Sequence, residues 1–150
     1  LAGSEDLVKA VSKIQSQETS APSTISQAAG LAAYSGTLDE VHTMRASFKE
    51  RRDFMVQELN SIEGVSCFSP GGAFYVFPDI SSYLGKKTPD GTPITDSTSL
   101  CLYLLDACGL AVVPGDAFGE PNGLRMSYAA GMDDLKEALQ RFKQGLEQLS

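Results

Sequence analysis

Apolar residues recur at helical spacing through the first 62 residues of the chain. A stripe of apolar residues within 4–16 follows Ser4, a residue type that caps helices well. Pro22 stands at the first position of a second helical run, which ends at Gly36. The longest periodic segment covers residues 38–62, with apolar positions three, four or seven residues apart. The pattern predicts two helices followed by one helix of about seven turns.

The spacing of apolar residues changes after this long helix. The segments VSCFSP and GGAFYVFPDIS, residues 65–70 and 71–81, predict two short strands around a turn at Gly71 and Gly72. A helix, two more short strands and a final helix follow. Their predicted bounds are Asp96 or Ser97 to Cys108 for the helix, 110–114 and 124–129 for the strands, and Asp133 for the start of the final helix. This order indicates an α/β chain whose second part is a small α+β domain carried on the long helix.

Composition narrows the classes of function. The 150 residues are 42% hydrophobic and 21% charged with a net charge of -7, and no apolar run approaches the ~20 residues that cross a bilayer. An acidic chain is a poor match for nucleic acid or for an anionic membrane surface. We therefore expect a globular protein that binds neither.

Cysteine usage indicates the redox compartment. The three cysteines, Cys67, Cys101 and Cys108, are too few for a disulfide framework, and no C-x-x-C spacing suggests zinc. On one helix Cys101 and Cys108 would lie about 10 Å apart, which is too far for a disulfide. We expect buried, reduced thiols and a reducing compartment, either cytoplasmic or organellar.

The common catalytic motifs are missing from the sequence. It has no G-x-G-x-x-G, no phosphate loop, no G-x-S-x-G and no H-E-x-x-H. His42, the only histidine, has no second histidine or nearby cysteine with which to hold a metal. Asp79, Asp116 and Glu120 could form an acid pair only if the fold converges them, and nothing in their spacing does so. We expect no metal site.

Arg125 is the best lead to a functional site. It lies in LRMSYA, residues 124–129, where apolar residues alternate with Arg125, Ser127 and Ala129. A strand would place Arg125 on a face of small residues, where its planar fork of donors suits a carboxylate. On spacing alone, an ordinary surface or ion-paired arginine is the more common occupant of such a position.

Several segments in order resemble one enzyme family. They are IQSQETSAPSTISQAA, GGAFYVFPD, LAVVPGDAFG and LRMSYA followed by a helix, which together extend over nearly the whole chain. In combination they resemble the C-terminal part of a fold-type I, pyridoxal-phosphate-dependent aminotransferase. More narrowly, the chain is similar to the prokaryote-type aspartate aminotransferase group, which includes the glutamate or aspartate-prephenate aminotransferases.

The resemblance implies roles for individual residues. The family's arginine in this strand holds the substrate α-carboxylate by a two-pronged contact, which implies that role for Arg125. The phenylalanine of GAFY lies near the substrate, which implies that Phe74 is a wall of the pocket; a core aromatic residue is the alternative. The loop at 19–22 would pack at the subunit interface of a homodimer, with Ala21 where relatives often carry asparagine.

The resemblance also implies domains and a cofactor. Residues 1–36 would end the large cofactor domain, 37–63 would form the interdomain helix and 64–150 the small C-terminal domain. The cofactor would be pyridoxal 5'-phosphate, and the substrates an amino acid, aspartate or glutamate by resemblance, and a 2-oxo acid. The family's imine-forming lysine lies upstream of the matched segments, so the missing N-terminal part of the protein would supply it, with any targeting region. The chain alone should then be inactive.

A second hypothesis belongs to another class of function. The chain could be a non-catalytic binding or assembly module that retains the aminotransferase small-domain fold. A reading frame that continues upstream through a Ser-Lys strand favours the enzyme, whereas an initiator methionine just before residue 1 favours the module.

Overall fold

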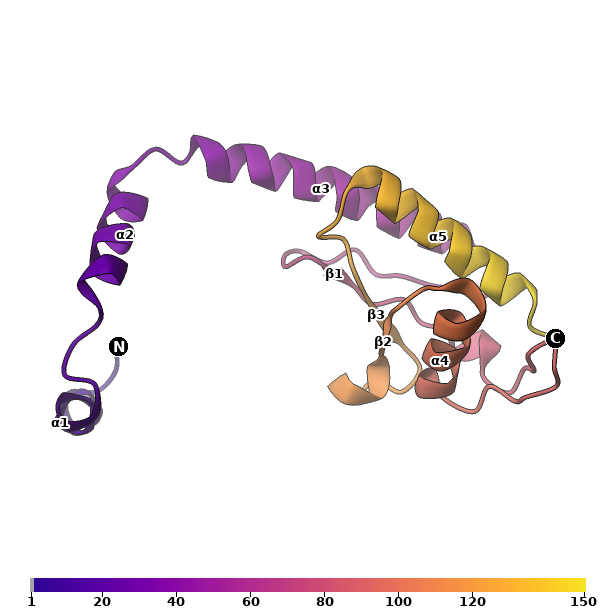
Figure 1. Cartoon of the computed structure of the whole chain (residues 1–150), viewed down its shortest axis with the longest axis horizontal. Helices are drawn as coiled ribbons and strands as arrows, with labels where there is room; N and C mark the ends of the chain where they lie inside the picture. The colour runs from indigo at the N-terminus through magenta and orange to yellow at the C-terminus, as the bar shows by residue number, and fades with distance from the viewer. Residues whose placement is uncertain (1) are drawn as a thin grey trace. The chain divides into compact units, whose positions relative to one another are not determined.

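The structure is a computed structural model that describes residues 2–150. Its contacts divide the chain into two compact units, one ending at His42 and the other covering Thr43–Ser150. Figure 1 labels the helices and strands in chain order. Within the described residues, no helix combines the length and the apolar character needed to span a bilayer.

The first unit contains the two predicted helices, α1 at Glu5–Glu18 and α2 at Thr24–Ser35. The prediction that Pro22 begins the second helix was wrong, because α2 begins at Thr24 with Ser23 at its N-cap. The Gln27 side chain donates to the Pro22 carbonyl over 2.9 Å, while the Gln27 backbone N–H closes the first helical turn on Ser23. Pro22 therefore belongs to the preceding loop.

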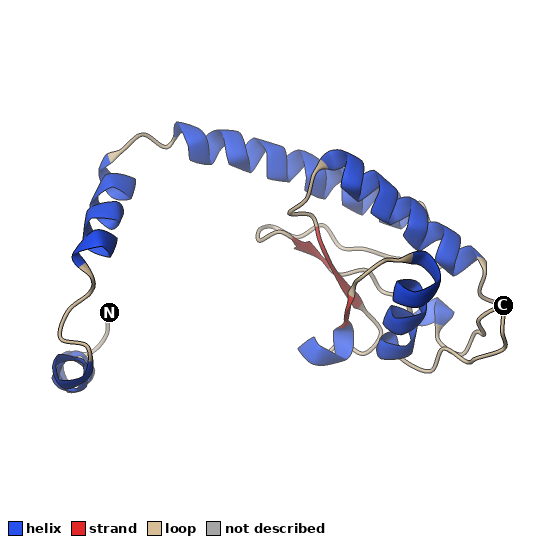
Figure 2. Cartoon of the chain, in the orientation of Figure 1, coloured by secondary structure: helices blue, strands red, loops and turns tan. Residues whose placement is uncertain are grey.

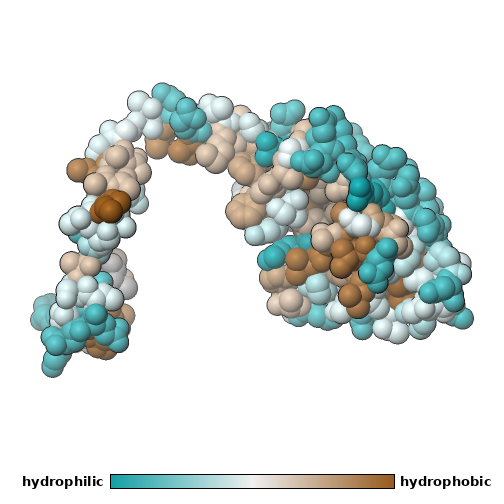
Figure 3. Space-filling model, in the orientation of Figure 1, coloured by the Kyte–Doolittle hydropathy of each residue, from teal (hydrophilic) through white to brown (hydrophobic). Residues whose placement is uncertain are grey.

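Apolar side chains of the first unit are left uncovered by the described residues. No residue of α1 or α2 is buried, and Ile25 and Leu31 are 81% and 70% exposed. Patches of hydrophobic residues on this part of the chain are visible in Figure 3. A helix with such a face normally packs against other protein.

The long helix α3 covers Asp39–Asn60, slightly shorter than the predicted 38–62. It ends at Asn60, whose side chain donates to the Val56 and Cys67 carbonyls and accepts from the Cys67 N–H. The Asn60 side chain therefore links the last turn of α3 to the segment around Cys67. Only the C-terminal half of the helix carries buried residues, Met55 and Leu59, whereas Val41 and Met44 are more than half exposed.

A small antiparallel sheet forms in the second unit, with strand order β1-β3-β2 (Figure 2). The strands are β1 at Tyr75–Val76, β2 at Val113–Pro114 and β3 at Leu124–Ser127. Tyr75 pairs with Ser127, and Val113 pairs with Arg125. The strand that occurs last in the sequence is therefore the central one.

The predicted strand at 65–70 does not form. Its only sheet contact is an isolated antiparallel bridge between Ser66 and Asp79. The Cys67 backbone is already bound by the Asn60 side chain, and Pro70 has no N–H to give to a ladder. The segment from 71 to 81 instead pairs through β1 with β3.

Helices α4 at Ser97–Cys108 and α5 at Met132–Glu147 complete the unit, with short 3-10 turns η1 at Ser81–Tyr83 and η2 at Gly115–Phe118. Asp96 caps α4 in a capping box with Ser99, and the Ser99 N–H holds the pKa of the Asp96 carboxyl below its ordinary value. Gly109 ends α4 in the left-handed conformation, as predicted. The final helix begins one residue before the predicted Asp133.

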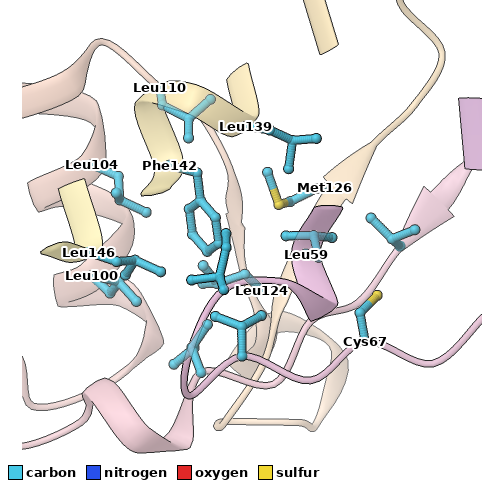
Figure 4. Close-up of a cluster of buried hydrophobic side chains, with 14 of the residues drawn as sticks. Leu59, Cys67, Leu100, Leu104, Leu110, Leu124, Met126, Leu139, Phe142 and Leu146 are labelled. Atoms are coloured by element: carbon cyan, nitrogen blue, oxygen red, sulfur yellow. The ribbon is translucent and has the colours of Figure 1, made fainter. Parts of the chain in front are cut away.

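The core of the second unit gathers side chains from α3, β1, η1, α4, β3 and α5 (Figure 4). The apolar stripe of α5 is buried there, namely Leu135, Leu139, Phe142 and Leu146, with Leu149 just beyond the helix. Leu124 and Met126 of β3 enter the same cluster, so α5 packs on the face of β3 opposite to Arg125. The alternation predicted for LRMS is confirmed.

All three cysteines are free, and Cys67 and Cys101 are buried whereas Cys108 is half-buried. Burial raises the pKa of Cys101 to about 11 and also raises that of Cys67. Because the thiolate is the reactive form, the raised pKa should make Cys101 slow to react.

We therefore expect Cys108 to react first when the folded chain is treated with iodoacetamide at pH 8. Peptide mass mapping of timed samples measures the three rates. In urea the three thiols should react alike, because unfolding removes the burial that raises the pKa of Cys67 and Cys101. Alkylation of Cys101 as fast as Cys108 in the folded chain would contradict the buried environment.

Candidate functional site

Arg125 lies in the middle of the central strand, half-buried, between two aromatic rings. Its guanidinium carbon is 4.4 Å from the centroid of the Tyr75 ring and 4.4 Å from the centroid of the Phe118 ring. Both contacts are within the range of a cation–π interaction. The guanidinium carbon therefore has an aromatic ring close to it from β1 and another from the turn after β2.

The sheet register explains why Tyr75 reaches Arg125. Tyr75 stands opposite Ser127, two residues beyond Arg125 on the same face of β3. A diagonal neighbour of this kind is within reach of a long side chain and an aromatic ring. β1 therefore supplies one of the two rings.

A turn built on glycines supplies the other ring. η2 follows β2 and carries Phe118, whose ring meets the Phe77 ring edge-on with centroids 6.1 Å apart. A Cβ on Gly115 would overlap the carbonyl oxygens of Glu120 and Gly123, so the turn closes only without a side chain there. This tight turn fixes Phe118 beside the strand that carries Arg125.

The Arg125 guanidinium has no acidic partner among residues 2–150. Five other basic residues do form ion pairs there, namely Lys9, Lys49, Arg52, Lys136 and Arg141. The ordinary ion-paired arginine considered from the sequence is thus not what the described residues form. Its donors remain available to a ligand that offers acceptors, such as a carboxylate.

Phe74 lies next to this cluster and outside the buried core, with 41% of its surface exposed. Its ring is 4.5 Å from the Tyr75 ring and 6.4 Å from the Phe48 ring, measured between centroids. Four side chains therefore follow one another in contact: Phe74, Tyr75, Arg125 and Phe118.

Tyr128 holds the backbone on both sides of Phe74. Its hydroxyl donates to the Ala73 carbonyl and its backbone N–H donates to the Phe74 carbonyl, each over 2.9 Å. Ala73 adopts a positive φ of 61°, a conformation that few residues other than glycine hold without support. Burial raises the pKa of the Tyr128 hydroxyl, which keeps it protonated as a donor.

The other residues considered from the sequence do not join this site. Asp79 accepts hydrogen bonds from Ser81 two residues on, and Asp116 of η2 accepts one from Ser97 at the start of α4, so both carboxylates are engaged elsewhere. His42 is exposed on α3. No group of His, Cys, Asp and Glu among residues 2–150 could hold a metal.

The lysines of the chain lie at the surface of the described residues. Six of the seven are exposed, and Lys86 is half-buried with its ammonium 5.0 Å from the centroid of the Tyr83 ring. An activated lysine needs a desolvated pocket or a cationic neighbour that lowers its pKa. None of these side chains is therefore assigned to a cofactor.

The hollows on the surface lie away from Arg125. One of about 560 Å³ is lined by the loop at 88–94 and by α4, and another of about 690 Å³ lies between Gly64 and Lys143. Both are shallow grooves on the second unit, and Arg125 lines neither.

Sequence reasoning missed Tyr75 and Phe118. Both occur in the segments that carry the family resemblance, GAFY and VPGDAFG, and each stands near a residue or loop already singled out. Their contact with Arg125 depends on the register of β1 and the path of η2, which no local pattern specifies.

The comparisons with known proteins define the class of this chain. Residues 1–142 match the model of the family described as aminotransferase class I and II, and the chain belongs to that family. It is 47% identical to the aspartate aminotransferase of Rhizobium meliloti strain 1021 over 148 residues, which are 99% of this chain and 36% of that enzyme. The resemblance seen in the sequence is confirmed.

Two further relatives support the same placement. A bifunctional aspartate aminotransferase and glutamate/aspartate-prephenate aminotransferase of Petunia hybrida is 47% identical over 97% of this chain and 31% of its own length. The crystal structure of the Rhizobium meliloti aspartate aminotransferase is 46% identical with a TM-score of 0.94, covering 99% of this chain and 37% of that one. The chain thus spans about a third of the relatives it matches, corresponding to their C-terminal part.

Proposed function

We propose that this chain is the C-terminal segment of a pyridoxal-phosphate-dependent aminotransferase that moves an amino group between aspartate or glutamate and a 2-oxo acid. Arg125 binds the α-carboxylate of the substrate. The observation that carries this proposal is a half-buried guanidinium in cation–π contact with Tyr75 and Phe118, whose donors have no acidic partner among the described residues. The family match and the named aspartate aminotransferases support the reaction class.

The chemistry of the site suits this role. A guanidinium presents parallel N–H donors that match the two oxygens of a carboxylate. Two such hydrogen bonds set the direction of the Cα substituents, which is the orientation that amino-group transfer requires. Phe74, exposed beside Tyr75, forms one wall of the amino-acid pocket and excludes water from it.

The proposal assigns a task to each part of the chain. Residues 1–36 end the large cofactor domain, residues 37–63 form the interdomain helix, and residues 64–150 form the small domain. The apolar faces of α1 and α2 are uncovered, which supports the idea that other protein packs on residues 1–36. In this proposal the rest of the same protein and a second subunit of a homodimer supply that protein surface.

Pyridoxal 5'-phosphate is the cofactor that the family implies for the full-length enzyme. The exposed lysines of this chain support an imine lysine located elsewhere in the protein, so the chain by itself is proposed to be inactive. Three free thiols favour a reducing compartment, cytoplasmic or organellar.

In the full-length enzyme, Arg125→Ala should lower kcat/KM by the equivalent of roughly 2 to 5 kcal/mol, because a substrate carboxylate loses its charged partner. Arg125→Lys should recover only part of this loss, since an ammonium keeps the charge but not the paired donors. Steady-state kinetics with aspartate and with glutamate, at cofactor occupancy checked by absorbance, measures both effects.

A third amino donor that lacks a side-chain carboxylate, such as alanine, distinguishes the α-carboxylate from the side-chain carboxylate. The loss should be similar for every amino donor, because all of them share the α-carboxylate. A loss confined to dicarboxylic donors would move Arg125 to the side-chain pocket. Unaltered kinetics would make it a surface arginine and remove the basis of the proposal.

Pyridoxal phosphate added to the 150-residue chain should form no stable imine at one site, since its lysines lack a desolvated pocket. Borohydride reduction followed by peptide mapping detects such imines. The full-length enzyme serves as the control and should yield one dominant modified lysine outside this chain. A dominant lysine within the chain, at near-stoichiometric yield, would overturn the assignment.

The isolated chain should also self-associate, because α2 exposes Ile25, Leu31 and Tyr34 by 81%, 70% and 95%. Light scattering coupled to gel filtration measures the mass of the species formed. Replacing Ile25 and Leu31 by serine should shift the chain toward monomer. A monomeric wild-type chain with one sharp, cooperative unfolding transition would show that the first unit needs no partner.

A further inference from the structure

We propose that Tyr75 and Phe118 are positioning residues that hold the Arg125 guanidinium in the orientation required to receive the substrate α-carboxylate. Neither residue binds the substrate in this proposal; both act through Arg125. The inference rests on the proposed function of Arg125 and adds the means by which an arginine without an acidic partner is kept in place.

The two rings reach Arg125 from different sides of the central strand. Tyr75 comes from β1, the neighbour of β3 on one side, and Phe118 comes from η2, which follows the neighbour on the other side. Each ring centroid is 4.4 Å from the guanidinium carbon, which is contact distance for a stacked cation. The side chain is therefore restrained from both directions.

The rings are themselves held by further contacts. Tyr75 packs on Phe74 with centroids 4.5 Å apart, and Phe118 meets the edge of Phe77 at 6.1 Å. Phe77 in turn fills the space where a Cβ of Gly123 would otherwise stand. The support of Arg125 thus extends to residues of β1, the chain after it and the loop before β3.

Aromatic faces suit this task better than a carboxylate would. A neighbouring carboxylate would occupy the same N–H donors that the substrate needs and would compete with it. A ring restrains the flat face of the guanidinium by cation–π attraction and leaves the in-plane donors open. The arginine is preorganised without being neutralised, so less side-chain freedom is lost when the substrate binds.

The test compares ring-deleting and ring-keeping variants of the full-length enzyme. Tyr75→Leu and Phe118→Leu remove a ring at similar apolar character, while Tyr75→Phe and Phe118→Tyr keep it. The leucine variants should raise KM by roughly 3- to 30-fold, the range set by the strength of a cation–π contact, with kcat changed by less than about twofold. The ring-keeping variants should match the wild type.

The division between KM and kcat separates positioning from a structural role. A variant that only destabilises the fold lowers the fraction of active enzyme, so kcat falls while KM stays constant. The rise in KM should have the same factor for aspartate and for glutamate, because both present the same α-carboxylate. A fall in kcat alone, or a rise in KM for one donor only, would overturn the inference.

A double substitution tests whether the rings act through Arg125. In an Arg125→Lys background, Tyr75→Leu should raise KM by a smaller factor than in the wild type, because the flat cation that the ring orients is gone. An equal factor in both backgrounds would show that Tyr75 acts independently of Arg125 and would overturn the inference.

The single variants separate this inference from the proposed function on which it rests. If Arg125→Ala does not change the kinetics, the proposed function fails. If Arg125→Ala lowers kcat/KM strongly and the leucine variants leave KM unchanged, only this inference fails.

Discussion

The burial of one face of β3 beneath α5 is the constraint on which the second unit depends. Leu124 and Met126 point into the core with Phe142 and Leu139, and the pleat of the strand then forces Arg125 to the other face. A shift of register by one residue would bury the arginine and expose the leucine and methionine. The apolar core therefore fixes the direction of the polar side chain that binds the substrate in our proposal.

The opposite face of β3 shows how a half-buried guanidinium can keep its hydrogen-bond donors unoccupied. Transferring a cation from water has a cost that most proteins offset with an ion pair. Here Tyr75 and Phe118 offer polarisable rings, while the carboxylates Asp79 and Asp116 accept hydrogen bonds from the serines Ser81 and Ser97. The Arg125 guanidinium is thus left without an acidic partner among the described residues, as our proposal for it requires.

The two units of the chain differ in whether they bury a hydrophobic core of their own. Thr43–Ser150 has a continuous buried cluster, while the helices before it bury nothing within the described residues. An amphipathic or alanine-rich helix gains its stability mainly from the surface it packs on. This contrast accords with a chain that spans about a third of the relatives it matches.

The sequence by itself determined the helices, the alternation of LRMS and the family, because these depend on periodicity, capping and ordered motifs. Asp96 begins α4 with a side-chain cap, and Gly109 ends it in a left-handed backbone conformation that glycine adopts readily. The strand expected at 65–70 failed because Asn60, a residue outside the segment, bound its backbone.

The tertiary structure alone decided that β3 is the central strand and that Tyr75 and Phe118 meet Arg125. Strand order and the path of a glycine turn join residues far apart in the chain, and such contacts leave no periodic trace in the sequence. The sequence identified the arginine, whereas only the fold showed what holds it.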